Sequence, residues 1–393
     1  MLHVDRLSTS DLRELITSDN WPSISIYMPT HKLGALSEDR IRIRNLLRAA
    51  EKRLEDAGFK RTASHDVLGP AYKLIEDTRF WSHLSEGLSL HLAPGRSRIY
   101  RLPVAFREFL SVGRRFHVKP LFAVQRESPE FCLLALSEKA CKLYRGGRYS
   151  MEEVQLADLP SGMAEALHIE DLRRNLRVHT GDVEKSVGVY HVQGSSSEEA
   201  VVKRWLRDYC YALDRAVCDY LGRGDTYLLV AAVEPIFAIY REANRYPRFI
   251  PRNVRPNMKH TTQDELRQEA WRHIEDEQSA ARQSLLRRYG ELRGSGLAAD
   301  CLARLLPACF HGQVDTLFID MDAESWGRFD VQRNRIHANA ASGAVELYDL
   351  AARQAWMSGA RIHALASGEL RAEDGIAAIL RYSYTLSPDA AVG

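Results

Sequence analysis

The sequence predicts a multi-domain α/β protein, and three observations carry this prediction. The chain has 393 residues, which is more than a single domain normally needs. Hydrophobic residues make up 45% and charged residues 27%, a composition that can bury several cores. Apolar strand patterns alternate with amphipathic helix patterns along most of the chain, and this order is typical of α/β layers.

The first region has the mixed pattern of an α+β module. Residues 23–27 alternate like a strand, and residues 39–57 combine an apolar stripe of helical period with many basic side chains. Two further strand patterns flank Pro94-Gly95, a strong turn signal. We therefore assign residues 1–125 to an N-terminal α+β domain.

The second region opens with three short strand patterns, the last two joined by Gly146-Gly147. Apolar residues then recur every third or fourth position over residues 198–221, which predicts an amphipathic helix. Its polar face is expected to carry Lys203, Arg204, Arg207, Asp208 and Asp214.

A continuous apolar strand, residues 226–233, and a helix over residues 234–243 follow this amphipathic helix. A long helix, residues 262–292, completes the region, and Gly294-Ser295-Gly296 ends it. We assign residues 126–295 to a middle domain.

The last region restarts the alternation of helices and strands after Gly296. Helices are expected at residues 297–306, 344–357 and 375–380, and strands at residues 316–319 and 361–366. This order predicts an α/β sandwich for residues 296–393.

Bulk composition excludes several classes of protein. The formal net charge is only +2, so no chain-wide field for nucleic acid follows from it. No apolar run is long enough to span a bilayer, and charges occupy the place of a signal peptide. Six cysteines occur without a C-x-x-C motif, as expected for reduced thiols. We expect a cytoplasmic protein with no membrane partner.

The common catalytic motifs are absent from the sequence. It contains no P-loop, G-x-G-x-x-G, H-E-x-x-H or G-x-S-x-G motif. His168-Ile169-Glu170 and His273-Ile274-Glu275 match H-x-E, but the P-C-x-x-C of zinc deaminases does not follow either of them. His, Asp and Glu never cluster at metal-ligand spacing. We expect no cofactor and no metal, and self-contained catalysis has little support.

One candidate site is the polar loop at residues 190–197, just before the amphipathic helix. It contains His191, Gln193 and Gly194. An exposed loop held on a rigid helix can present a reaching tip to a partner. An ordinary connection between elements is equally compatible with this pattern.

The second candidate site is the basic segment, residues 240–260. Its cations outnumber its one acidic residue, Glu242, by five: Arg241, Arg245, Arg248, Arg252, Arg255 and Lys259. Three prolines prevent one continuous helix, and aromatic residues are interleaved. A stiffened basic loop suits a phosphate backbone, although a solvated surface loop has the same composition. Arg248, Arg252 and Arg255 have no acidic neighbour in sequence, so we expect them to be free for RNA.

Several stretches, in this order along the chain, resemble one family. They are FWSHLSEGLSLHLAPGRSRIYRLP (80–103), VGRRFHVKPLF (112–122), LLALSEKACKLYRG (133–146), YREANRYP (240–247) and AAILRY (377–382). They resemble the bacterial branch of the archaeo-eukaryotic release-factor and Pelota superfamily, over nearly the whole chain. The resemblance implies a ribonuclease-H-like middle domain and a C-terminal α/β/α sandwich similar to kink-turn RNA-binding ribosomal proteins. It also implies the ribosome and ribosomal RNA as partners, not DNA, and leaves open whether a translational GTPase is another.

The resemblance also bears on hydrolysis. In release factors the corresponding middle-domain loop carries Gly-Gly-Gln, which positions water against the peptidyl-tRNA ester. Here the matching residues are Val192-Gln193-Gly194, so no glycine pair precedes Gln193. Val192 is β-branched and avoids the backbone conformations that glycine permits. Gln193 is therefore only a weak catalytic candidate.

Three functions are compatible with these observations. The leading one is a ribosome-associated factor that occupies a tRNA-like site in rescue or dormancy without hydrolysing peptidyl-tRNA. The second is a peptidyl-tRNA hydrolase or release factor that uses Gln193. The third is a protein-binding adaptor that no longer acts on the ribosome.

Overall fold

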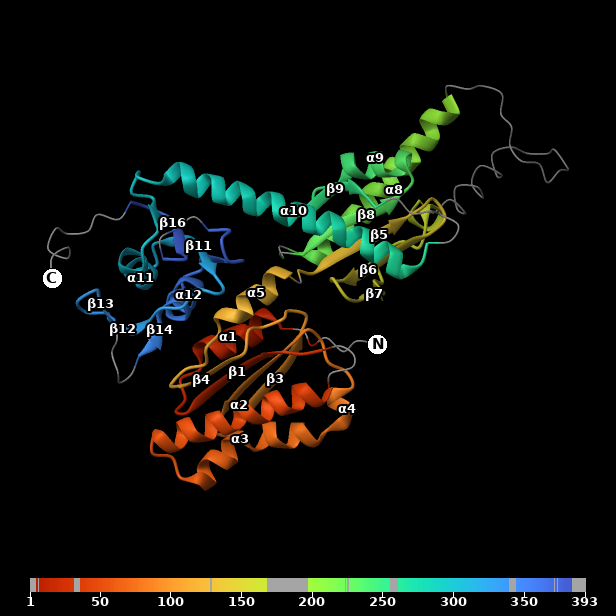
Figure 1. Ribbon diagram of the computed structural model, residues 1–393. Helices are drawn as coiled ribbons and strands as arrows, with labels where there is room; N and C mark the ends of the chain where they lie inside the picture. The colour runs from red at the N-terminus through yellow and green to blue at the C-terminus, as the bar shows by residue number, and fades with distance from the viewer. Residues whose placement is uncertain are drawn as a thin grey trace, which may run out of the picture. The chain divides into compact units, whose positions relative to one another are not determined.

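The computed structural model describes residues 5, 7–31, 36–127, 129–167, 197–222, 224, 226–254, 261–338, 344–370, 372 and 374–383. The chain forms two compact units: unit 1 is Met1–Ser128 with Ser284–Gly393, and unit 2 is Pro129–Gln283. The described residues form four β-sheets with helices packed against them (Figure 1), which confirms a multi-domain α/β protein. The division into three domains at residues 125 and 295 stays a prediction. No described helix has the length and apolar character that crossing a membrane requires.

The first segment of unit 1 contains a four-stranded antiparallel sheet in the order β3-β2-β1-β4. Its strands are β1 (Ser23–Pro29), β2 (Gly87–Ala93), β3 (Arg96–Leu102) and β4 (Phe109–Gly113). The predicted turn at Pro94-Gly95 joins β2 to β3, and Gly95 supplies the positive φ of 70° there. The helices α2 (Leu36–Asp56) and α3 (Arg61–Glu76) share a hydrophobic cluster with alternate residues of β1 and β2. The short helix α4 (Thr78–Trp81) adds Trp81 to that cluster.

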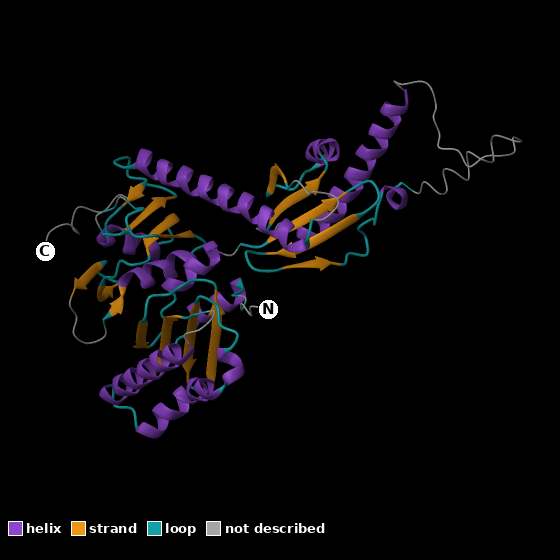
Figure 2. Cartoon of the chain, turned by 45° about the vertical axis from the view of Figure 1, so that its right-hand side comes forward, coloured by secondary structure: helices purple, strands orange, loops and turns teal. Residues whose placement is uncertain are grey.

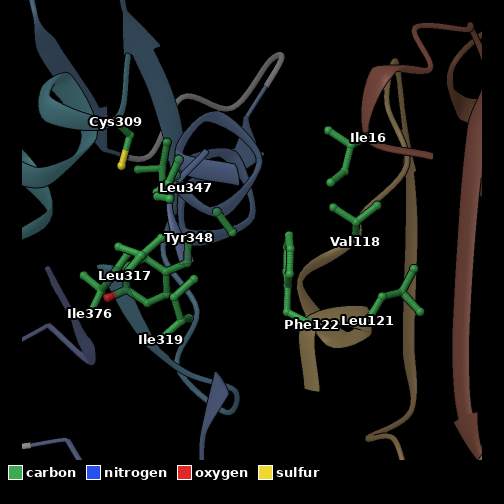
Figure 3. Packing of buried hydrophobic residues seen from close by; sticks show 14 of the residues in the cluster. Ile16, Val118, Leu121, Phe122, Cys309, Leu317, Ile319, Leu347, Tyr348 and Ile376 are labelled. Carbon is green, nitrogen blue, oxygen red and sulfur yellow. The ribbon is translucent and has the colours of Figure 1, made fainter. Parts of the chain in front are cut away.

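A second hydrophobic cluster joins the two segments of unit 1. It contains side chains from α1 (Thr9–Thr17) and α5 (Lys119–Glu127) and from α11 (Leu302–Phe310) and α12 (Leu347–Met357). Figure 3 shows Phe122 and Leu121 of α5 among these residues, with Leu317 and Tyr348 from the second segment. Chain segments far apart in sequence therefore share one core.

Two buried side chains of α12 add directional bonds between the same segments. Asp349 accepts hydrogen bonds from the backbone N of Val118 and of Lys119, both at 2.6 Å, although Val118 lies 231 positions away. These donors lie at the start of α5, where the helix dipole favours a negative charge. The Arg353 guanidinium donates to the carbonyl oxygen of Phe116 at 2.7 Å and to that of Ile16. The segments are thus fixed by polar geometry as well as by apolar burial.

The second segment of unit 1 contains two small sheets. The larger has the order β10-β16-β11-β15, and the smaller has β13-β12-β14. Their strands are β10 (Ala298–Ala299), β11 (Val314–Asp320), β12 (Trp326–Asp330), β13 (Arg335–Ala338), β14 (Val345–Glu346), β15 (Arg361–Leu365) and β16 (Ile376–Leu380).

Two predictions for this segment were wrong. Residues 376–380, expected in a helix, form β16 between β10 and β11, and all five are buried. A short apolar run has no periodicity that separates a buried strand from a buried helix. The helix expected from residue 297 begins only at Leu302, because Ala298 and Ala299 pair with β16 instead.

Unit 2 is built on one mixed five-stranded sheet in the order β7-β6-β5-β8-β9. The strands β5 (Phe131–Leu136), β6 (Cys141–Gly146) and β7 (Met151–Val154) form an antiparallel meander, whereas β8 (Tyr227–Ala232) and β9 (Phe249–Asn253) run parallel to β5. The helices α8 (Ser197–Leu221) and α9 (Glu234–Ala243) pack with the Cys132 and Leu134 side of β5, together with α6 (Met163–Ala166).

The opposite side of that sheet packs with Ala270, Trp271 and Ile274 of α10 (Gln263–Leu292). Because alternate side chains of a strand point to opposite faces, β5 serves two cores at once. Figure 2 shows helices around the strands of this sheet. All six cysteines are free thiols, and four of them are buried.

His91 makes unit 1 sensitive to acid. Its ring is fully buried among Tyr27, Tyr100 and Phe116, and neither ring nitrogen has a hydrogen-bond partner. Burial, with a smaller contribution from His117, lowers the pKa of His91 to about 3. The unfolded chain therefore binds a proton below about pH 6.5 that the folded chain excludes, so stability falls as pH drops from 6.5 towards 3.

We predict that His91→Phe flattens this dependence, removing a loss of up to about 5 kcal/mol across that window. Urea unfolding between pH 3 and pH 7 measures the effect. His65→Phe, which changes an exposed ring stacked on Tyr72, serves as the control and should leave the slope unchanged. An identical pH slope for His91→Phe and the parent would contradict the prediction.

Candidate nucleic-acid interface

Four of the predicted binding residues lie where the structure describes the chain, and five do not. Arg241, Arg245, Arg248 and Arg252 are described and exposed. Residues 190–196 of the predicted loop lie outside the described residues, and its last residue, Ser197, begins α8. The residues that consequently have no described position are His191, Gln193, Gly194, Arg255 and Lys259.

The basic segment is not the continuous loop that its prolines predicted. The helix α9 ends at Ala243, and Phe249–Asn253 form β9, the edge strand parallel to β8. The register between Leu228↔Phe249 and Val230↔Asn253 is irregular, which places extra residues on β9. Pro251 lies in this irregular stretch, and an edge strand tolerates a residue without a backbone N–H. The loop prediction was therefore wrong for residues 249–253.

A buried carboxylate holds the connection between α9 and β9. Asp214 of α8 is fully buried and accepts hydrogen bonds from Asn244 Nδ2 at 3.1 Å and from the backbone N of Arg245 at 3.2 Å. It also accepts one from Arg245 Nε at 3.1 Å. The hydrogen bond to Asp214 and its negative charge raise the pKa of Arg245. The Arg245 side chain is thereby anchored at one end while 68% of it stays exposed.

The prediction that Asp214 lies on the polar face of α8 was wrong, because Asp214 is fully buried. A helical pattern places Asp214 at the border of the apolar stripe, next to Leu213. Its burial depends on the partners that α9 delivers, which are about thirty positions away in sequence. The sequence signal for this role is only that border position.

Arg248, directly before β9, and Arg252 of β9 have partners from other elements. The Arg248 guanidinium carbon lies 4.6 Å from the centre of the Tyr227 ring, the geometry of a cation–π contact. Arg252 Nη1 lies 3.0 Å from Asp276 Oδ2 of α10. The prediction that Arg252 has no acidic partner was therefore wrong. Both partners of that pair are well exposed, and such a pair contributes at most about 1 kcal/mol. A phosphate can therefore replace Asp276 at little cost.

The side chains of this candidate interface are suited to binding anions. Four exposed guanidinium groups come from the end of α9, the connection and β9. Guanidinium groups bind phosphate oxygens through two parallel hydrogen bonds. Within the described ranges, no group of three or more His, Cys, Asp or Glu side chains could hold a metal ion.

Part of unit 2 matches the model of a known protein family. Residues 131–276, which include the whole sheet of unit 2 and both helices that carry the interface, match a family model of bacterial release factors of archaeo-eukaryotic type. The predicted resemblance to this branch is therefore confirmed. The model describes bacterial archaeo-eukaryotic release factor family 7, and this part of the chain is similar to it. No curated protein matches the sequence significantly.

Solved structures of translation factors are also similar to the chain, at low identity. An archaeal translation termination factor, aRF1, is 15% identical with a TM-score of 0.23, covering 96% of this chain and 99% of its own. A ribosome-bound archaeal Pelota model with ABCE1 is 11% identical with a TM-score of 0.37, covering 97% and 96%. Saccharomyces cerevisiae Dom34 is 10% identical with a TM-score of 0.34, covering 75% and 74%.

Replacing Asp214 tests whether it organises the interface. Asp214→Ala leaves the amide of Asn244 and the backbone N of Arg245 without their buried acceptor, so we expect the free energy of unfolding to fall by about 2 kcal/mol. Urea unfolding followed by circular dichroism measures the change. Asp208→Ala removes an exposed carboxylate from the same helix and should have almost no effect. Equal stability of the two variants would show that Asp214 has no such role.

Proposed function

We propose that this protein is a ribosome-associated factor of the release-factor class that occupies a tRNA-like site during ribosome rescue or dormancy. Its partners in this proposal are the ribosome and ribosomal RNA, with a translational GTPase as a further candidate. The family match of residues 131–276 supports the class. Four exposed arginines of unit 2 are the observation that carries the RNA partner: Arg241 of α9, Arg245 and Arg248 of the connection, and Arg252 of β9. We call these four residues the β9 edge.

The finer fold assignments belong to the same proposal. The strand order of unit 2, an antiparallel meander followed by two parallel strands with a helix before each, supports a ribonuclease-H-like domain. The sheet of β10, β16, β11 and β15 with α11 and α12 supports a C-terminal sandwich similar to kink-turn RNA-binding ribosomal proteins. Both assignments agree with the three domains proposed at residues 1–125, 126–295 and 296–393.

The proposal excludes intrinsic hydrolysis of peptidyl-tRNA. A loop that places a glutamine against the ester needs a backbone that two glycines permit, and Val192 stands directly before Gln193. The retained glutamine is what favours the second candidate function, a peptidyl-tRNA hydrolase that uses Gln193.

A peptide-release assay separates these two functions. We predict that the purified protein releases no peptide from programmed ribosomes above the rate without it, and that Gln193→Ala behaves in the same way. A bacterial release factor on the same ribosomes provides the positive control. Release by the parent that disappears in Gln193→Ala would establish the hydrolase instead.

A salt series tests the RNA-binding edge. We predict that the double variant Arg248→Ala with Arg252→Ala binds ribosomes about tenfold more weakly, a change of about 1.4 kcal/mol. Each lost phosphate contact also removes counterion release, so the slope of log affinity against log salt should decrease by about 1.5 in magnitude. Co-sedimentation with ribosomes from low to moderate salt measures both quantities.

The matched control is Arg115→Ala with Arg361→Ala. These two arginines of unit 1 are comparably exposed and are each paired with an aspartate, as Arg252 is. They should leave the affinity and the slope unchanged. If the Arg248 and Arg252 variant matches this control while the parent binds ribosomes, the β9 edge is only a solvated surface. If the parent does not bind ribosomes at all, the adaptor function takes precedence.

A further inference from the structure

The solvent face of α8 carries cations around one exposed aromatic ring. Arg207 and Arg215 lie four residues before and after Tyr211, and Arg204 lies one turn further back, so all four share a face of the helix. All four are exposed, and 47% of the Tyr211 side chain is accessible to solvent. We call these residues, together with Arg245, the α8 surface.

Arg245 joins this face from a second element. Its guanidinium is fixed at 3.1 Å from the buried Asp214 of α8. Asp214 follows Tyr211 by three residues, about one turn of α8, so the Arg245 guanidinium lies beside the face that carries Tyr211. The α8 surface therefore combines residues of a helix with a residue of the connection between α9 and β9. The spacing of residues along α8 alone does not produce it.

The arginines of α8 contribute little to folding. Among the described residues, no ion pair involves Arg204, Arg207 or Arg215, although Asp208 and Asp219 lie at the border of the face. Cations three or four residues apart on a helix repel each other slightly. An exposed tyrosine ring also gains little from burial in the folded chain. The arrangement instead favours a ligand that supplies negative charge and a flat apolar group together.

Unpaired RNA has both of these properties. Guanidinium groups bind phosphates bidentately, and an aromatic ring stacks on a base that is not already stacked in a helix. An acidic peptide would engage the arginines but leave the ring unused. A membrane surface would need a continuous apolar face, and Tyr211 is the one large apolar side chain among these five residues.

We propose that the α8 surface binds unpaired RNA, with Tyr211 stacking on a base and with Arg207, Arg215 and Arg245 contacting phosphates. The inference rests on the proposed function, because it names a second part of unit 2 through which the protein contacts ribosomal RNA. It adds to the β9 edge a contact that phosphate binding alone does not provide.

Fluorescence anisotropy with a labelled twelve-nucleotide oligouridine, using the full-length chain, tests the stacking contact. Tyr211→Ala should weaken binding about tenfold, whereas Tyr211→Phe, which keeps the ring, should bind like the parent. Tyr382→Ala removes a comparably exposed tyrosine from unit 1 and serves as the control. The double variant Arg207→Ala with Arg215→Ala should reduce the salt slope by about 1.4 in magnitude, as expected for two contacts on a single strand.

Two results would overturn the inference. One is that Tyr211→Ala binds oligouridine with the affinity of the parent, and the other is that Tyr211→Ala and Tyr211→Phe lose affinity equally. A double-stranded RNA of the same length that binds as tightly as oligouridine would also contradict it. Co-sedimentation of the same variants with ribosomes separates this inference from the proposed function. If the parent sediments with ribosomes but oligouridine binding does not depend on Tyr211, the inference fails and the function stands. If oligouridine binding depends on Tyr211 but the parent does not sediment, the function fails and the inference stands.

Discussion

The buried carboxylate of Asp214 is the interaction on which the candidate interface depends. It accepts hydrogen bonds from Asn244 and Arg245 and so fixes the connection between α9 and β9 against α8. A buried carboxylate is costly unless donors satisfy it, and these donors exist only when α9 is docked. One group thus couples the packing of the helices to the position of the exposed arginines, because Arg245 belongs to both the β9 edge and the α8 surface.

The same physical principle operates in unit 1. Asp349 and Arg353 of α12 bind backbone groups of the first segment, and the same two segments share the hydrophobic cluster that contains Phe122 and Tyr348. Apolar burial is not directional, so it can bring two segments together without fixing their register. Hydrogen bonds from a buried carboxylate to the start of α5 restrict the arrangement to one geometry. In both units, therefore, a buried acid sets the geometry of parts that are distant in sequence.

Much of the fold could be predicted from the sequence where the apolar pattern is long or repeated. The helix Glu234–Ala243 has the predicted bounds, and α8 begins one residue before its prediction. The prediction failed at Ile376–Leu380, where five buried apolar residues carry no period that separates strand from helix. It failed again at β9, because prolines that usually mark loops also fit an irregular edge strand.

The candidate site was predictable in charge but not in geometry. The excess of arginines in residues 240–260 is visible in the sequence, and the four that are described are exposed. Their partners are not visible there, since Asp214, Tyr227 and Asp276 lie far away along the chain or in another element. Only the docking of α8, α9 and α10 on one sheet brings these groups together.

Site-specific photocross-linking on the ribosome tests the central claim most directly, namely that unit 2 meets ribosomal RNA through the surface that Asp214 organises. A photoreactive amino acid is placed at position 241, the exposed end of α9, and in a second protein at position 361 of unit 1. Both proteins are bound to purified ribosomes and irradiated, and the cross-linked species are separated into RNA and protein. The account predicts cross-links to ribosomal RNA from position 241 and none from position 361. Cross-links from position 241 to ribosomal proteins alone, or any RNA cross-link from position 361, would contradict it.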